Sequence, residues 1–225
     1  MPRSTCISRT AYALRNSLLA CVLGLLSSVA LADARELNIS QLISNSAQTR
    51  LNNWQQLINR APNLSNDEKL RAVNQLINSS LSYASDQQTW GQTEYWATPS
   101  EALQRGQGDC EDFAIAKYFS LIKMGIADAQ LRLLQVKDLR SKSAHIVLAY
   151  YLSPQSQPLL LDNLTDRILP ANQRKDLLAI YAFNAEGIYL AKAPTQKIAQ
   201  PISMLSRWVA VTARMHHSDN AQPLL

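Results

Sequence analysis

The stretch from Arg105 to Tyr118 (RGQGDCEDFAIAKY) places a cysteine where a glycine-containing loop runs into a helix. Gly106 and Gly108 allow backbone angles that other residues resist, and the apolar positions that follow recur every three to four residues, as in a buried helix. Cys110 therefore begins that helix, where the dipole and the free amide groups favour a thiolate. The pattern predicts a nucleophilic thiol; the alternative is a buried, inert cysteine.

His145 and Asp162 are the residues predicted to assist this cysteine. A cysteine nucleophile needs a base, and the base needs a third group that orients it. His145 opens one strand-like segment and Asp162 ends the next, and the turn Ser153–Pro158 between them predicts a hairpin that brings both side chains within hydrogen-bonding reach. His216 and His217 lie in the polar tail, where no chemical role is expected. We therefore expect a Cys–His–Asp triad.

In this interpretation Cys110 attacks a carbonyl carbon, His145 pairs with the thiolate and later protonates the leaving amine, and Asp162 fixes the imidazole tautomer. Asn163 is an alternative orienting residue. The oxyanion that forms needs hydrogen-bond donors. The candidate donors are the backbone N–H of Cys110 and the side chains of Trp96, Gln104 and Gln107.

Three carboxylates, Asp109, Glu111 and Asp112, surround the predicted nucleophile. One explanation is helix capping and favourable charge at the positive end of the helix dipole. Three carboxylates exceed what capping requires, and without a counter-charge they would raise the pKa of the thiol. A hard cation such as Ca²⁺, which binds carboxylate and carbonyl oxygens, would resolve this conflict. The sequence leaves both explanations open, since the spacing is not that of an EF-hand loop.

The elements that must position these residues change in character along the chain. Ser65 and Glu68 form a capping-box pattern ahead of a periodic apolar run, whereas the segments after the central helix are rich in β-branched and aromatic residues. Helices are expected at 51–60, 65–80 and about 98–103, strands at 132–136, 144–152, 159–163, 179–184 and 187–190, and a strand or helix at 209–214. Helices followed by an antiparallel sheet predict an α+β fold. The aromatic residues of 82–100 either line a cleft or cover the core.

Residues 1–32 have the pattern of a secretory signal: Arg3, Arg9 and Arg15 without acids, an apolar run, and Ala30-Leu31-Ala32 as a cleavage motif. We expect cleavage after Ala32 and export, which leaves a domain over 33–225 with a helical part to about 100 and a catalytic core over about 100–215. The net charge then falls from +5 to about +2, which gives no case for nucleic-acid binding. Cys110 becomes the only cysteine, so no disulfide can form within the chain.

The blocks WATPSEALQRGQGDCEDFAIAKY, HIVLAY, LLLDN and YAFNAEGIYLAK resemble the bacterial transglutaminase-like cysteine proteinases, in particular the LapG-type periplasmic proteases, over roughly residues 50–195. The resemblance implies a papain-like/transglutaminase-like core, in which the helix bearing the cysteine packs on an antiparallel sheet. It implies a triad of Cys110, His145 and Asp162. It also implies calcium dependence, with Asp109 and Glu111 at the family's acidic positions and Asp112 joining them.

The same resemblance implies a biological role. The expected substrate is the N-terminal region of a large, repetitive surface adhesin, whose cleavage at a dialanine releases it and disperses biofilm. The expected inhibitor is the periplasmic domain of a LapD-like inner-membrane receptor that responds to cyclic di-GMP, with Trp90 or Trp96 as candidate contacts. Ile146 departs from the methionine that usually follows the histidine in the family, a conservative change.

Two other classes of function fit the same residues. A transglutaminase or a peptidoglycan amidase would use the same triad and thioester intermediate, and would differ in the attacking group or in the substrate. A non-catalytic binding module would keep Cys110 buried and unreactive, so alkylation of this thiol at neutral pH would count against that reading.

Overall fold

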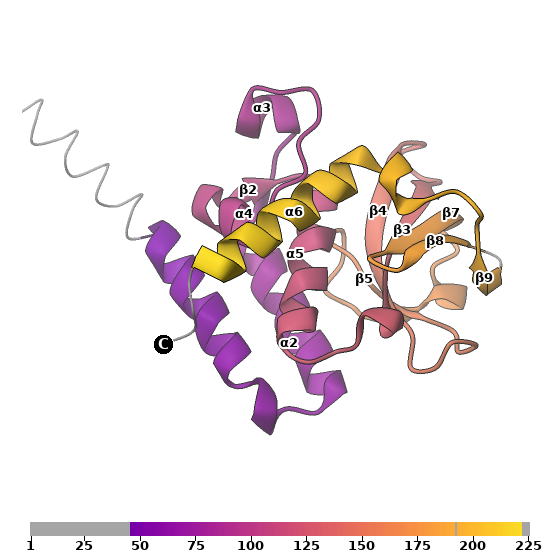
Figure 1. Ribbon diagram of the computed structural model, residues 1–225, viewed down its shortest axis with the longest axis horizontal. Coiled ribbons are helices and arrows are strands. Elements are labelled where there is room, and N and C mark those ends of the chain that lie inside the picture. Colours follow the sequence, from indigo (N-terminus) through magenta and orange to yellow (C-terminus); the bar gives the residue numbers. More distant parts are fainter. Residues whose placement is uncertain (1–45, 192, 222–225) are drawn as a thin grey trace, which may run out of the picture. The chain divides into compact units, whose positions relative to one another are not determined.

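The computed structural model describes residues 46–191 and 193–221, which form mixed helical and sheet structure (Figure 1). The predicted signal peptide at 1–32 lies outside the described residues. A helix over residues 46–59 comes first. The remaining helices are η1 (Ala61–Asn63), α2 (Asn66–Ser80), α3 (Asp86–Trp90), α4 (Pro99–Arg105), α5 (Cys110–Lys123), η2 (Asp128–Gln130), η3 (Ala171–Gln173), η4 (Ile202–Met204) and α6 (Ser206–Ala221).

The strands form two sheets. They are β1 (Ser82–Tyr83), β2 (Gln107–Gly108), β3 (Leu131–Asp138), β4 (Ala144–Tyr150), β5 (Leu159–Leu161), β6 (Leu169–Pro170), β7 (Leu177–Asn184), β8 (Gly187–Leu190) and β9 (Ala193–Lys197). The main sheet has the order β6-β5-β4-β3-β7-β8-β9, and every pairing in it is antiparallel. The short β1 and β2 pair in parallel, apart from it. Helices followed by an antiparallel sheet confirm the predicted α+β class.

Two helices begin with the side-chain caps that their sequences indicate. The hydroxyl of Ser65 accepts the N–H of Glu68, and the Glu68 carboxylate accepts the N–H of Ser65, which completes the capping box of α2. Thr98 and Glu101 make the same exchange at the start of α4. These caps satisfy amide groups that the first helical turn leaves without partners.

Helix α5 is the centre of the larger hydrophobic core. Its apolar side chains pack against α2 and α4 on one side and against alternate residues of β4, namely Ile146, Leu148 and Tyr150, on the other. Trp208 of α6 is fully buried and makes an edge contact with Tyr118 of α5, with ring centroids 5.2 Å apart. Figure 1 shows α5 between α2 and the sheet, with α6 crossing it. The helix that begins at Cys110 is therefore held rigidly.

The structure decides one open alternative and differs from the sequence interpretation at several other places. Residues 209–214, expected as a strand or a helix, are helical, as part of α6, because Trp208, Val211 and Met215 form one buried stripe. The tail expected from His216 onwards instead continues this helix to residue 221. The short helix α3 was not predicted. Neither were the edge strands β6 and β9, whose sequences are too short or too polar to show alternation.

Among the described residues, no helix combines the length and the apolar character that crossing a bilayer requires.

Candidate active site

Cys110 is the first residue of α5 and Asp109 occupies the N-cap position, as the sequence predicts. The Asp109 carboxylate, however, makes no capping hydrogen bond, so capping does not explain its presence. The Cys110 thiol donates to Oε2 of Glu111 at 2.9 Å, and the nearby backbone of Ile146 on β4 acts to lower the pKa of the thiol. The sulfur is thus fixed where α5 meets the sheet.

The loop ahead of Cys110 depends on a close approach at one glycine and on a turn at another. Gly106 ends α4 with a φ of +70°, and the guanidinium of Arg50 packs against it while donating to the carbonyls of Leu103 at 2.6 Å and Gln104 at 2.9 Å. Gly108 has no room for a side chain because Asp112 fills the space. The glycines predicted to shape the loop therefore do so for different reasons.

His145 and Asp162 contact each other directly. Nε2 of His145 lies 2.8 Å from Oδ1 of Asp162, and both side chains are buried. Strands β4 and β5 pair as the predicted hairpin, with Leu148 opposite Leu161, so Asp162 follows the last paired residue of β5. The orienting contact is made by Asp162 and not by the alternative residue, Asn163.

The charge of Asp162 determines which nitrogen of His145 carries the proton. Burial would raise the pKa of Asp162, but the hydrogen bond and charge of His145, the N–H of Leu164 and the guanidinium of Arg174 lower it to about 2. An ionised carboxylate only accepts hydrogen bonds, so Nε2–H of His145 is the donor. Nδ1 is then the ring nitrogen that carries no proton.

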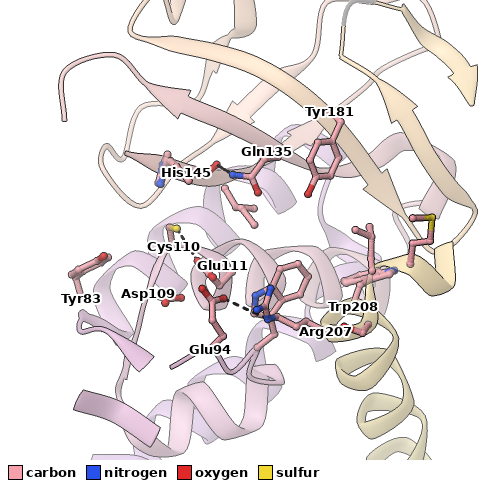
Figure 2. A pocket seen from close by; sticks show the side chains of 16 residues that line it. Tyr83, Glu94, Asp109, Cys110, Glu111, Gln135, His145, Tyr181, Arg207 and Trp208 are labelled. Atoms are coloured by element: carbon pink, nitrogen blue, oxygen red, sulfur yellow. Dashed lines mark hydrogen bonds and ion pairs between the residues drawn. The ribbon is translucent and has the colours of Figure 1, made fainter. Parts of the chain in front are cut away.

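Cys110 and His145 line the same pocket, which has a volume of about 410 Å³. Figure 2 shows the sulfur of Cys110 on one wall and His145 on the strand above it, while Arg207 and Trp208 lie at the other end. Asp109 and Glu111 belong to the same wall as the cysteine. The pocket is also lined by Tyr83, Glu94, Trp96, Gln135, Ala144, Ile146, Tyr181, Met204, Leu205 and Ser206. Two members of the predicted triad and two of the predicted carboxylates therefore line one cavity, and the buried Asp162 lies behind His145, outside the pocket lining.

Of the three side chains predicted as candidate oxyanion donors, Trp96 is the one that lines this pocket. Its Nε1 is buried and has no hydrogen-bond partner in the described part of the chain. Gln104 and Gln107 are exposed and lie outside the pocket lining. Trp90 and Tyr95 pack on each other and on the core, so the aromatic segment serves partly as cleft wall and partly as cover.

A cluster of three carboxylates lies beside the sulfur. Oxygens of Asp86, Asp109 and Glu111 lie within 4.8 Å of one another, an arrangement that could hold a metal ion. Oδ1 of Asp86 and Oδ1 of Asp109 are buried and accept no hydrogen bond from any described residue. Oδ2 of Asp86 receives the N–H of Tyr95 at 2.5 Å, which fixes its orientation. Unpartnered buried carboxylate oxygens fit a hard cation such as Ca²⁺.

Asp86 was missed by sequence reasoning, and Asp112 is placed differently from the expectation. Asp112 is fully buried, and its Oδ1 receives the N–H of Ala97 at 2.8 Å, outside the cluster of three. Asp86 lies on α3, far from the cysteine in sequence, and its only local pattern is a capping box that begins at Ser85. No motif could have connected it with Cys110.

The electrostatics of this wall follow from burial and crowding. Burial, followed by the negative charge and hydrogen bond of Glu111, raises the pKa of the Cys110 thiol. Burial and the neighbours Glu111 and Asp112 raise the pKa of Asp109 to about 9. Burial also raises the pKa of Asp112 to about 7. These shifts disfavour negative charge at the cysteine as long as no cation is present.

A cysteine at the start of a central helix, facing a histidine on an antiparallel sheet, defines the papain-like and transglutaminase-like class of thiol enzymes. Comparison with known families narrows this class. The family model described as "Bacterial transglutaminase-like cysteine proteinase BTLCP" matches residues 44–177. The chain belongs to this family and is a cysteine protease of the LapG type.

Solved structures agree with this assignment. Legionella pneumophila LapG is 37% identical and superposes with a TM-score of 0.65, over 78% of this chain and 96% of that one. A calcium-bound form of the same protein matches with a TM-score of 0.67, over 78% of this chain and 98% of that one. An EGTA-treated form also matches with a TM-score of 0.67, over 78% of this chain and 96% of that one. The fold is therefore transglutaminase-like. No curated protein sequence matches the chain significantly.

Proposed function

We propose that this protein is a calcium-dependent endopeptidase in which Cys110, His145 and Asp162 form the catalytic triad. The observation that carries the proposal is the 2.8 Å contact between His145 and Asp162, because His145 also lines the pocket that holds the Cys110 sulfur. The family assignment supplies the reaction class, and the geometry supplies a role for each residue.

The chemistry follows from the proton positions. His145 Nδ1 takes the thiol proton, and the Cys110 sulfur attacks the peptide carbonyl carbon to form a tetrahedral oxyanion. The N–H of Cys110 and Nε1 of Trp96 are the candidate donors to that oxygen. When the C–N bond breaks, the imidazolium returns its proton to the amine and a thioester remains. His145 then deprotonates a water, which attacks the thioester and restores the thiol. Asp162 stabilises the imidazolium throughout.

We assign the cation site to Asp86, Asp109 and Glu111. The buried Oδ1 atoms of Asp86 and Asp109, which lack hydrogen-bond partners among the described residues, the closeness of the three carboxylates and the calcium-bound state of Legionella LapG support this assignment. A bound Ca²⁺ would supply positive charge beside Cys110 and offset the carboxylates that crowd it. Asp112 remains a predicted contributor, and the structure gives it a separate task, since it holds the Ala97 amide.

We further propose that the protein acts in the periplasm on the N-terminal region of a large surface adhesin, whose release promotes biofilm dispersal. The apolar, arginine-flanked N-terminal segment supports export. The LapG-type resemblance supports the substrate, and also a LapD-like receptor domain as inhibitor. The open pocket at the end of α5 is large enough to admit an extended peptide segment.

The deciding experiment mixes the purified protein, or its Cys110→Ala variant, with the N-terminal fragment of a candidate adhesin in either calcium or EGTA. We expect one discrete product, formed only with the intact cysteine and only with calcium. Cleavage that persists in EGTA would remove calcium from the proposal. Incorporation of a fluorescent amine in place of cleavage would indicate a transglutaminase, and binding without cleavage in every arm would indicate a binding module.

A further inference from the structure

We propose that Arg174 is a positioning residue of this active site: its guanidinium holds the carboxylate of Asp162 from the side opposite His145. This inference rests on the proposed triad, and goes beyond it by assigning a fourth residue. Arg174 lies between η3 and β7, and neither its sequence neighbourhood nor any motif connects it with the cysteine.

The contacts divide the Asp162 carboxylate between two partners. Oδ1 receives His145 Nε2 at 2.8 Å and the N–H of Leu164 at 3.0 Å, while Oδ2 is paired with Nη2 of Arg174 at 2.8 Å. Asp162 and Arg174 are 1% and 5% exposed. The hydrogen bonds at Oδ1 and the ion pair at Oδ2 together restrain rotation of the carboxylate about its terminal bond, which keeps Oδ1 directed at His145.

The guanidinium is itself fixed by a second carboxylate. Nε and Nη2 of Arg174 contact Oδ1 and Oδ2 of Asp176 at 3.0 and 2.9 Å, a two-point contact that matches the planar geometry of both groups. Arg140, whose side chain is 76% exposed, pairs with the same Asp176 from the solvent side. His145 thus contacts Asp162, Asp162 pairs with Arg174, Arg174 pairs with Asp176, and Asp176 pairs with Arg140 at the surface.

A buried ion pair is often neutral for stability, so the position of Arg174 needs another explanation. Three described cationic or titratable groups face Asp162: His145 from β4, Arg174 from the segment before β7, and Lys117 from α5. Of these, Arg174 alone holds the oxygen that His145 leaves free. Arg174 does not line the pocket of Cys110, and it contacts the Asp162 oxygen that His145 does not. Its effect on catalysis must therefore pass through the orientation of His145.

The test uses four variants that differ in how directly they reach Asp162. Arg174→Gln removes the charge and the two-point contact, Arg174→Lys keeps the charge, and Asp176→Asn leaves Arg174 present but less firmly held. Arg140→Gln is the matched control, because it breaks an ion pair with the same Asp176 without touching Arg174. Each variant is checked for folding by circular dichroism, and kcat and KM are measured on the adhesin fragment in calcium.

We expect Arg174→Gln to lower kcat by about tenfold to hundredfold with little change in KM, since misorientation of the base affects the chemical step and not the binding of substrate. Arg174→Lys should recover part of this loss, Asp176→Asn should show a smaller loss, and Arg140→Gln should match the wild type. Normal kcat in a folded Arg174→Gln protein would overturn the proposal. If that variant does not fold, normal kcat in both Arg174→Lys and Asp176→Asn would overturn it.

A second readout separates positioning from a structural role. The chain has three histidines, so the His145 Nε2–H proton can be followed by NMR with ¹⁵N-labelled histidine. We expect its downfield signal to shift or broaden in Arg174→Gln and to persist in Arg140→Gln; an unchanged signal in Arg174→Gln would contradict the inference. This measurement needs no substrate, so it stands even if the wild type cleaves nothing. Normal cleavage by Asp162→Asn would contradict the proposed triad. Normal cleavage by the Arg174 variants, together with loss of cleavage in Asp162→Asn, would contradict only the role of Arg174.

Discussion

Gly108 lacks a side chain because Asp112 occupies the adjacent space. A Cβ added there would lie 2.7 Å from both Cβ and Oδ2 of Asp112, which is buried and holds the Ala97 amide. We expect Gly108→Ala to displace this segment of α5 and to lower kcat/KM by about tenfold or more, as measured by cleavage of the fragment. Gly91→Ala is the control: its φ is left-handed, at +67°, but nothing lies within 4 Å of an added Cβ, so only backbone strain of about 1 kcal/mol is expected. Equal effects of the two changes would contradict the role of Asp112.

The burial of Lys117 predicts a measurable pH dependence of the free energy of unfolding. It is fully buried on α5, and its Nζ has no hydrogen-bond partner within 46–191 and 193–221. Burial lowers its pKa to about 7, although Asp162 and Asp166 act in the opposite direction. Between about pH 7 and the ordinary pKa of 10.5, the unfolded chain holds a proton that the folded one lacks. Unfolding then takes up a proton, so this residue makes the free energy of unfolding rise with pH in that window.

We expect Lys117→Met to remove this pH-dependent rise and to increase stability at neutral and lower pH, where the buried ammonium is a cost. Urea unfolding between pH 6 and pH 9.5 would measure the effect. Lys123→Met on the same helix is the control, since Lys123 is exposed, and it should leave the slope unchanged. A slope that survives in Lys117→Met would show that other groups produce it.

The residues that the sequence could predict are those with local signals. A cysteine after two glycines at a helix start, and a histidine and an aspartate on neighbouring strands, each belong to a pattern that extends over a few residues. Asp86 and Arg174 carry no such pattern, because they reach the site only through tertiary packing. Two members of the carboxylate cluster, Asp109 and Glu111, were therefore predicted from the sequence, and the third, Asp86, was not.

At the scale of elements, prediction succeeded where periodicity is strong and the ends are marked. The capping box of Ser65 and Glu68 identified α2, and β-branched and aromatic content indicated strands in the regions of β3, β4 and β7. Strands of two residues such as β6 contain no period to detect. Residues 209–214 have both β-branched and helical character, and packing on α5 decides for the helix.

The side-chain cap at the start of α4 allows a test of how much one helix end contributes to stability. Thr98 is buried, and its hydroxyl accepts the N–H of Glu101, at the start of the helix that delivers the glycine loop to Cys110. We expect Thr98→Ala to lower the free energy of unfolding by about 1 kcal/mol, since the amide loses its acceptor. Thr98→Ser keeps the hydroxyl and should recover most of this loss. Urea denaturation of both variants measures the difference, and equal stability of Thr98→Ala and the wild type would show that the cap contributes nothing.

At the scale of the whole molecule, the active site is assembled from parts that contribute little alone. Helix α5 supplies the cysteine, the hairpin of β4 and β5 supplies His145 and Asp162, and α3 adds Asp86 to the acidic wall. The hydrophobic core around α5 keeps these parts together. Because these elements pack on one core, a ligand bound by Asp86, Asp109 and Glu111 should stabilise the entire fold and not only the loop that holds it.

Calcium should therefore raise the melting temperature of the intact protein. A ligand that binds only the folded state at a hundred times its Kd adds about 2.7 kcal/mol to the free energy of unfolding. Asp86→Asn should largely abolish this increase while leaving the metal-free protein at least as stable as the wild type, because it removes one of three mutually repelling carboxylates.

Differential scanning calorimetry with calcium and with EGTA measures both effects. Asp67→Asn, which removes an exposed carboxylate paired with Arg71 on α2, is the matched control and should respond to calcium as the wild type does. An equal calcium shift in Asp86→Asn and the wild type would exclude Asp86 as a ligand. The absence of any shift in the wild type would exclude the site, because a cation that brings α3 and the start of α5 together cannot bind without stabilising the fold that holds them in place.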